Sequence, residues 1–201
     1  KIAGSYAMPG KTIEDGNDDD YVDSIAVGLY CWWQRMVSEI DAPYGHKYIP
    51  TPYSVSAHGA AGKRVGALPS GRLAGMALAD GSVSPCTGMD VKGPTAVMNS
   101  AGKIDQTPLF GTLLNTKFHP SAIRNEEDLS KLFALIKTYF GYGGKHVQFN
   151  VVDSKTLREA QRYPELYRGL IVRVAGYSAL FTELTRNIQE EIISRTEHTM
   201  V

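Results

Sequence analysis

Glycine and proline crowd the middle of this 201-residue chain and restrict what it can fold into. Eight of the ten prolines lie within residues 42–125. Because proline cannot donate to a β-ladder and both residues interrupt helices, we expect short strands and many loops there. Residues 53–57 and 111–118 could still form strands. A glycine-rich region this long is usually functional, unless it packs against a part of the protein outside this sequence.

Outside that region, hydrophobic spacing predicts the regular elements of an α/β fold. Apolar residues recur every three to four positions in three segments, as in amphipathic helices: residues 21–41, 126–140 and 184–192. For residues 21–41 we expect a helix packed in the core. A shorter helix should follow Asp153 or Ser154 and run through residue 161.

Two further segments, residues 146–152 and 170–174, have the pattern of strands. In the first, the side chains alternate between an apolar face (Val147, Phe149, Val151) and a polar face (His146, Gln148, Asn150). The second is a continuous apolar run that leads into a turn and then the last helix. These strands and helices together indicate the α/β class.

Charge and cysteine content argue against several kinds of function. Lys plus Arg equals Asp plus Glu at 21 each, so nothing in the net charge favours nucleic acid or an anionic membrane as a partner. The sequence has no apolar run of about eighteen residues, the length of a membrane helix. Cys31 and Cys86 are far apart, which argues against a disulfide framework or a zinc site and makes a reducing cytosol the default. The five histidines are scattered, and no metal site is expected.

Other features invite a catalytic interpretation that their context does not favour. Residues 62–66 are rich in glycine and cations but do not fit a phosphate-binding loop. Cys86 has no basic neighbour in the sequence that would lower its pKa. His58, His119 and His146 could act as acid or base, although isolated histidines more often serve structural hydrogen bonds.

The most informative segment is residues 173–177, Arg-Val-Ala-Gly-Tyr. Its glycine, Gly176, stands where the strand pattern gives way to a turn before the last helix. Such a glycine ordinarily meets a backbone need, which is either a positive φ or the close approach of another chain. The blocks that precede it favour a second interpretation.

Six blocks of the sequence carry a resemblance to a known family. They are residues 66–72 (GALPSGR), 78–85 (LADGSVSP), 93–96 (GPTA), 113–120 (LLNTKFHP), 146–150 (HVQFN) and 173–177 (RVAGY). In order and in sequence they resemble the motifs of the glycyl radical enzymes. The resemblance covers the whole chain, most firmly from residue 51 onward. It is nearer to the dehydratase, decarboxylase and arylsuccinate-synthase-like branches than to pyruvate formate-lyase.

The resemblance implies a fold and a set of site residues. The fold is a ten-stranded α/β barrel, of which residues 1–125 would be the loop-rich C-terminal part. Residues 126–201 would be the glycyl radical domain, ending in the radical loop and a helix. Gly176 would carry the radical, Arg173 and Tyr177 would position its loop, and Tyr53 would lie near the substrate pocket.

The resemblance also implies a mechanism with two catalytic partners. An activase with an iron–sulfur cluster cleaves S-adenosylmethionine and removes a hydrogen atom from Gly176; no other cofactor is expected. The glycyl radical then oxidises a cysteine to a thiyl radical, which attacks the substrate. That cysteine belongs to a loop on the N-terminal side of everything in this sequence. Neither Cys31 nor Cys86 has the expected context.

We therefore expect a C-terminal portion or small subunit that works with a cysteine-bearing portion, in an oligomer, in the cytoplasm of an anaerobic organism. The start without Met agrees with an internal or processed start. Dehydration and decarboxylation of a small substrate are both open. Addition to fumarate, a formate acetyltransferase-like activity and a replacement radical module for a damaged partner are the alternatives. Neither nucleic acid nor a membrane is expected as a partner.

Overall fold

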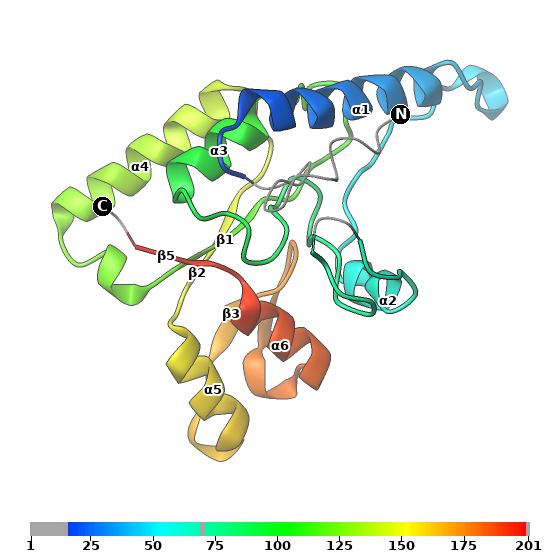
Figure 1. Ribbon diagram of the computed structural model, residues 1–201. Coiled ribbons are helices and arrows are strands. Elements are labelled where there is room, and N and C mark those ends of the chain that lie inside the picture. The colour runs from blue at the N-terminus through cyan, green and yellow to red at the C-terminus, as the bar shows by residue number, and fades with distance from the viewer. Residues whose placement is uncertain (1–15, 69–70, 200–201) are drawn as a thin grey trace.

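The computed structural model describes residues 16–68 and 71–199 and has the predicted α/β character (Figure 1). The α-helices are α1 (Asp20–Ser38), α2 (Ala57–Gly62), α3 (Pro94–Gly102), α4 (Glu126–Gly141), α5 (Ser154–Arg162) and α6 (Arg186–Ser194). The 3-10 helices are η2 (Pro43–Gly45), η3 (Pro120–Ala122), η4 (Pro164–Leu166) and η5 (Phe181–Glu183). The strands are β1 (Asn115–Phe118), β2 (Gln148–Val151), β3 (Ile171–Arg173), β4 (Ser178–Leu180) and β5 (Glu197–His198). Residues 1–15 of the expected segment 1–125, and Pro69 and Ser70 of the block 66–72, lie outside the described residues.

A parallel sheet of three strands, in the order β2-β1-β5, forms the middle of the molecule. Strand β1 pairs in register with β2, from Asn115 opposite Gln148 to Phe118 opposite Val151. Helix α4 connects these two strands, as parallel pairing requires. All four residues of β1, the central strand, are buried, so both faces of the sheet are covered there. Helices α1, α3 and α4 lie above this sheet in Figure 1, and α5 and α6 lie below it.

The Gly176 turn joins two strands, which corrects the prediction of a strand-to-helix turn. Strands β3 and β4 form an antiparallel hairpin, with Arg173 opposite Ser178, and Gly176 lies in the loop between them. Helix α6 begins only at Arg186. The sequence did not indicate β4, because a strand of three residues is too short to display a period.

Two hydrophobic clusters make up the core. The first lies around the hairpin and consists of Val152, Leu157, Ala160, Val172, Val174, Phe181, Ile192 and Ile193. The second lies around α3 and consists of Val83, Val97, Met98, Ala101, Ile104, Leu114 and Tyr139. Because Val174 belongs to the first cluster, the strand that leads into the Gly176 turn is anchored in the core.

Residues 21–41 form the expected helix, α1, but the prediction that it packs in the core is wrong for its second half. Val22 and Ala26 are buried, whereas Met36 is 48% and Ile40, just beyond the helix, 54% exposed. Helix α4 also matches its prediction, and its Phe133 is 66% exposed. The described residues therefore cover these apolar side chains only in part.

The predicted strand at residues 53–57 is wrong. Val55 has a φ of +52°, which is incompatible with a strand, and Ala57 already begins α2. The Ser54 hydroxyl donates to the carbonyl of Gly81 at 3.0 Å, and the Ser54 backbone N–H donates to the same carbonyl. These two bonds tie Ser54 to Gly81, 27 residues further along the chain, and not to a strand partner.

In strand β2 the polar side chains face inward. Gln148 and Asn150 are each only 5% exposed, whereas Val151 on the other face is 49% exposed. The alternation predicted for residues 146–152 is therefore confirmed, with a buried polar face. Buried amides need hydrogen-bond partners, and those partners lie in the Gly176 turn.

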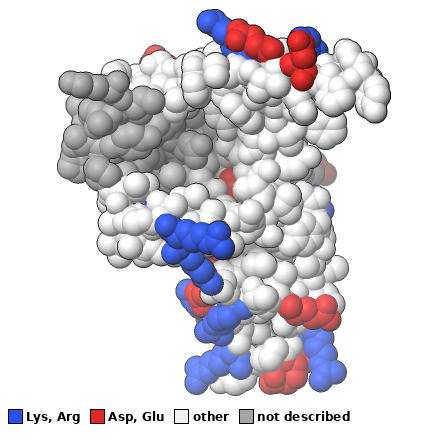
Figure 2. Space-filling model, turned by 90° about the vertical axis from the view of Figure 1, so that its right-hand side faces the viewer, with Lys and Arg blue, Asp and Glu red and all other residues white. Residues whose placement is uncertain are grey.

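Charged side chains on the face shown in Figure 2 gather at its top and in its lower part. Lys and Arg lie beside Asp and Glu there, and between them the surface is largely uncharged. No helix in residues 16–68 and 71–199 combines the length and the apolar character needed to cross a membrane.

Substituting Leu157, which is completely buried, tests how much the cluster around the hairpin contributes to stability. Replacing it by alanine leaves a cavity that costs about 2–5 kcal/mol, which should lower the melting temperature by about 5–15 °C. Leu166 is 73% exposed and is the matched control, since Leu166→Ala should change the melting temperature little. Melting curves followed by circular dichroism give the melting temperatures of the two variants for comparison. Equal melting temperatures would contradict this account of the core.

Candidate functional site

The Gly176 turn has a backbone that favours glycine. Gly176 has a φ of +81°, and the Val174 N–H donates to the carbonyl of Tyr177 at 2.9 Å to close the turn. A Cβ on Gly176 would meet only the Cδ2 atom of Leu113, at 3.6 Å, which is an ordinary contact. The backbone conformation, and not crowding, therefore disfavours a side chain at this position.

Gln148 holds both ends of the turn with one side chain. Its Oε1 atom accepts a hydrogen bond from the Gly176 N–H at 3.0 Å, and its Nε2 atom donates to the carbonyl of Val174 at 3.2 Å. Gln148 extends from the inward face of β2. The Gln148 amide thus fixes Gly176, the residue predicted to carry the radical, and Val174, the residue that enters the turn.

Asn150 repeats this arrangement on the preceding residue of the hairpin. Its Oδ1 atom accepts from the Arg173 N–H at 2.7 Å, and its Nδ2 atom donates to the Arg173 carbonyl at 2.7 Å. Because residues two apart in a strand share a face, Gln148 and Asn150 point to the same side of β2. Their amides bind the backbone of residues 173–176 as a neighbouring strand would.

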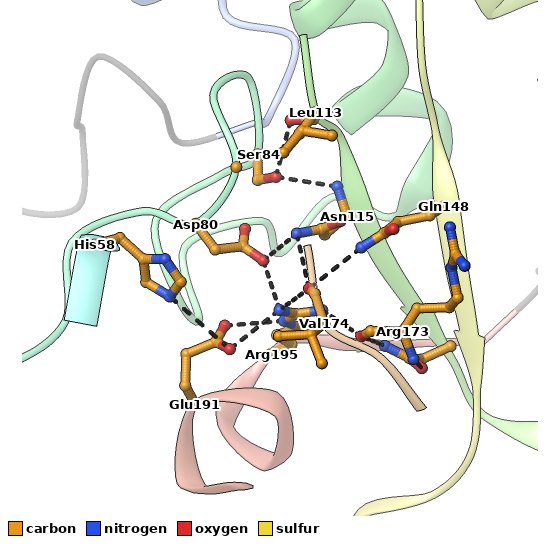
Figure 3. Close-up of polar contacts among 12 residues, drawn as sticks. His58, Asp80, Ser84, Leu113, Asn115, Gln148, Arg173, Val174, Glu191 and Arg195 are labelled. Atoms are coloured by element: carbon orange, nitrogen blue, oxygen red, sulfur yellow. Dashed lines mark hydrogen bonds and ion pairs between the residues drawn. The ribbon is translucent and has the colours of Figure 1, made fainter. Parts of the chain in front are cut away.

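Three side chains converge on the carbonyl oxygen of Val174 (Figure 3). Besides Gln148, the guanidinium of Arg195 donates to it at 2.8 Å and the Nδ2 atom of Asn115 at 3.4 Å. A carbonyl oxygen has two lone pairs, so its capacity to accept hydrogen bonds is fully used. The position of the turn is therefore set from β1, from β2 and from the end of α6.

Arg195 is buried between two carboxylates. It lies 2.8 Å from Asp80 and makes two hydrogen bonds with Glu191, at 2.9 and 3.0 Å. Burial alone would lower the pKa of Arg195, but Asp80 and Glu191 outweigh it and raise the pKa. Burial raises the pKa of Glu191, against the opposing effect of Arg195. Asp80 also accepts from Asn115 at 2.5 Å, so the ion pairs and the amides form one network.

Further buried contacts flank Arg195. His198 of β5 lies 3.0 Å from Asp90, and both side chains are buried. The Lys117 ammonium donates to the carbonyl of Ile193 at 2.8 Å, and burial lowers the pKa of Lys117. His58 of α2 lies 3.9 Å from Glu191. The chain on both sides of Arg195 is thus fixed by residues that come from far earlier in the sequence.

Of the two residues predicted to support the loop, Arg173 contacts its neighbours through both side chain and backbone, and Tyr177 does so through its backbone. The Arg173 guanidinium donates to the hydroxyl of Ser178 across the hairpin at 2.9 Å. Burial, and then the charge of Arg173, lower the pKa of His146. Tyr177 contributes its carbonyl to the turn, and its side chain is 40% exposed. Gly176 itself is exposed, so the described residues do not by themselves give it a dry environment.

The other candidate residues lie around this turn or away from it. Tyr53 is half-buried, and its ring lies against Gly111, two residues before the Leu113 that faces Gly176. Cys31 is exposed on α1, and Cys86 is half-buried in the loop before α3. Within residues 16–68 and 71–199, no group of three or more His, Cys, Asp or Glu side chains could hold a metal ion.

The sequence did not assign a role to the residues that hold the turn: Asp80, Asn115, Gln148, Asn150 and Arg195. One signal was present for two of them, because Gln148 and Asn150 alternate with apolar residues in a strand. An amide on the buried face of a strand needs a partner, and a turn with unpaired backbone groups can supply one. Asp80, Asn115 and Arg195 carry no comparable signal.

Comparison with known proteins places these residues in a family context. Residues 79–182, slightly more than half of the chain, match the family model described as Glycine radical. Indoleacetate decarboxylase of Tractidigestivibacter scatoligenes is 49% identical over 183 residues, which are 91% of this chain and 21% of that protein. Trans-4-hydroxy-L-proline dehydratase of Clostridioides difficile is 42% identical over 192 residues, 96% of this chain and 24% of that protein.

Solved structures agree with these matches. The glycerol-bound form of the B12-independent glycerol dehydratase from Clostridium butyricum superposes with a TM-score of 0.87 at 49% identity. The match covers 92% of this chain and 24% of that one. The chain thus spans about a fifth to a quarter of the length of the relatives it matches.

Arg195→Met tests the buried ion pairs. It leaves the carboxylates of Asp80 and Glu191 without their cation, and breaking a buried pair costs about 3–5 kcal/mol. Arg186→Met is the matched control, because Arg186 pairs with Glu190 at 3.4 Å on the surface and is 66% exposed. Losing such a pair costs ~1 kcal/mol or less. Urea unfolding of both variants gives the comparison, and similar unfolding free energies would refute the role assigned to Arg195.

Proposed function

The chain belongs to the glycine radical family, and on this premise we propose that Gly176 carries an organic radical on its Cα atom as part of a larger glycyl radical enzyme. The observation that carries the proposal is the environment of Gly176. It is a positive-φ glycine in a turn whose neighbouring backbone groups are bound by buried side chains. A surface turn that served only to reverse the chain would not need these partners.

The chemistry of a glycyl radical suits this turn. The amide nitrogen donates electron density to the Cα atom and the carbonyl withdraws it, which stabilises the unpaired electron. The absence of a side chain lets the centre become planar. Delocalisation also requires the preceding peptide plane to turn from the observed φ of +81° toward the plane of the radical, and Gln148 binds the N–H of that peptide group directly.

The reaction begins outside this chain. An activase with an iron–sulfur cluster and S-adenosylmethionine removes one hydrogen atom from the Gly176 Cα atom, and no other cofactor is proposed. The Gly176 radical then takes a hydrogen atom from a cysteine thiol, so that the S–H bond breaks, the Cα–H bond re-forms and a thiyl radical remains. That cysteine belongs to a further portion of the enzyme, which also covers the exposed Gly176.

The substrate is proposed to be a small molecule that undergoes radical elimination. A decarboxylase and a dehydratase among the relatives support loss of a carboxylate or of a C–O bond. Arylsuccinate-synthase-like addition to fumarate and formate acetyltransferase-like activity remain alternatives. Tyr53 is proposed to line the pocket, because its ring lies against Gly111 near Leu113, and Arg173 and Tyr177 are proposed to position the loop.

The surrounding architecture is proposed to be a ten-stranded α/β barrel. Residues 1–125 would contribute its C-terminal part, and residues 126–201 would be the glycyl radical domain. The exposed apolar side chains of Met36 and Phe133 support further packing against the rest of the enzyme. We propose that the assembly is oligomeric and works in the cytoplasm under anaerobic conditions.

Electron paramagnetic resonance tests the radical. The full-length enzyme, treated anaerobically with its activase, should show a doublet that is absent from Gly176→Ala. Gly143→Ala is the matched control, because Gly143 also has a positive φ, of +96°, and lies in the turn after α4. Both substitutions strain the backbone, but only the first removes the radical site. A doublet that survives in Gly176→Ala, or is absent from the unchanged enzyme alongside an active control enzyme, would refute the proposal.

Exposure to air locates the radical independently. Oxygen adds to a glycyl radical and cleaves the backbone there, so the activated enzyme should release a fragment beginning near Tyr177. Mass spectrometry identifies the fragment, and protein that was never activated should stay intact in the same air. Cleavage elsewhere, or equal cleavage without activation, would contradict the assignment to Gly176.

A further inference from the structure

We propose that Gln148 is a positioning residue that tunes the Gly176 radical through the hydrogen bond its side-chain amide accepts from the Gly176 N–H. The inference rests on the proposed function, because it assumes that Gly176 carries the radical. It adds a specific group that sets the distribution of the unpaired electron. Gln148 is not itself a reacting group.

The orientation of the Gln148 amide follows from its partners. The Gly176 N–H can only donate and the Val174 carbonyl can only accept. The Gln148 oxygen must therefore face Gly176, at 3.0 Å, and its nitrogen must face Val174, at 3.2 Å. Gln148 is 5% exposed, so water has little access to replace either bond.

A hydrogen bond at this N–H acts directly on the radical. When a carbonyl oxygen accepts from the N–H, electron density on the Gly176 nitrogen increases. When Cα becomes planar and φ moves from +81° toward coplanarity, the nitrogen lone pair donates more strongly to the Cα atom, and more of the unpaired spin spreads onto nitrogen. Less spin remains on Cα. Because the α-hydrogen splits the spectrum in proportion to that spin, the bond should narrow the doublet.

Three neighbours allow the role of Gln148 to be separated from general support of the turn. Asn150 binds the Arg173 N–H and carbonyl from the same face of β2, with equally buried geometry, but the structure gives it no bond to Gly176. Arg195 and Asn115 donate to the Val174 carbonyl independently of Gln148. Loss of the Gln148 nitrogen therefore leaves Val174 bound.

The experiment compares three variants of the full-length enzyme after anaerobic activation. Gln148→Met has similar volume and no amide, Gln148→Glu keeps an oxygen acceptor, and Asn150→Leu removes the neighbouring amide. We expect a wider α-hydrogen splitting in Gln148→Met than in the unchanged enzyme. Gln148→Glu should have a splitting equal to or narrower than that of the unchanged enzyme, and Asn150→Leu should have an unchanged splitting even where its radical yield falls.

The outcomes separate this inference from the function on which it rests. A doublet in the unchanged enzyme together with equal splittings in all variants would overturn the role of Gln148 and leave Gly176 as the radical site. Absence of the doublet in the unchanged enzyme would instead refute the proposed function. Equal widening in Asn150→Leu and Gln148→Met would indicate general support of the turn, and would also overturn the inference.

A measurement on the unchanged enzyme keeps the test decisive if the Gln148 variants fail to fold. In D2O the Gly176 N–H becomes N–D, and electron–nuclear double resonance gives the deuteron's quadrupole coupling. We expect the reduced coupling of a hydrogen-bonded deuteron. The larger coupling of a deuteron without an acceptor would overturn the proposal.

Discussion

The buried contact between Arg195 and the carbonyl of Val174 is the interaction on which the rest of the site depends. Burying a guanidinium has a large desolvation cost, which the carboxylates of Asp80 and Glu191 offset. The N–H group that remains directed at Val174 then fixes the strand that enters the Gly176 turn. The Arg195 guanidinium can hold the neutral carbonyl oxygen of Val174, because the carboxylates of Asp80 and Glu191 fix the position of the guanidinium itself.

The side-chain amides of β2 supply hydrogen-bond partners for backbone groups of the same hairpin. Backbone N–H and carbonyl groups that leave water need partners, and a hairpin loop has none of its own beyond the bond that closes it. Gln148 and Asn150 supply these partners from a neighbouring strand, with the alternation of a β-ladder. The N–H of Gly176 and the carbonyl of Val174 therefore have protein partners and need no solvent molecule.

The sequence predicts most of the elements but not how the site is held. Periodicity identified α1, α4, α6 and β2, and a capping residue identified α5. The family motif identified Gly176 as the candidate for the radical. The alternation at residues 53–57 was misleading because Val55 has a positive φ and Ser54 bonds to the distant Gly81. Strand β4 is too short to show a period. Asp80 could not be assigned, because its partners Asn115 and Arg195 are distant in the chain. The i,i+4 spacing of Glu191 and Arg195 is a local pattern, but it does not reveal the bonds of Arg195 to Asp80 and to the Val174 carbonyl.

Two residues of the network around Val174 come from outside residues 126–201, which argues against that segment acting alone as a replacement module. Asp80 and Asn115 both precede residue 126, and both reach the network around Val174. A module restricted to residues 126–201 would keep Glu191 and Arg195 but would lose the second carboxylate and one donor to the Val174 carbonyl. The Gly176 turn of such a module would be held by fewer hydrogen bonds and ion pairs. The structure therefore favours a radical segment that works together with the loop-rich region before it.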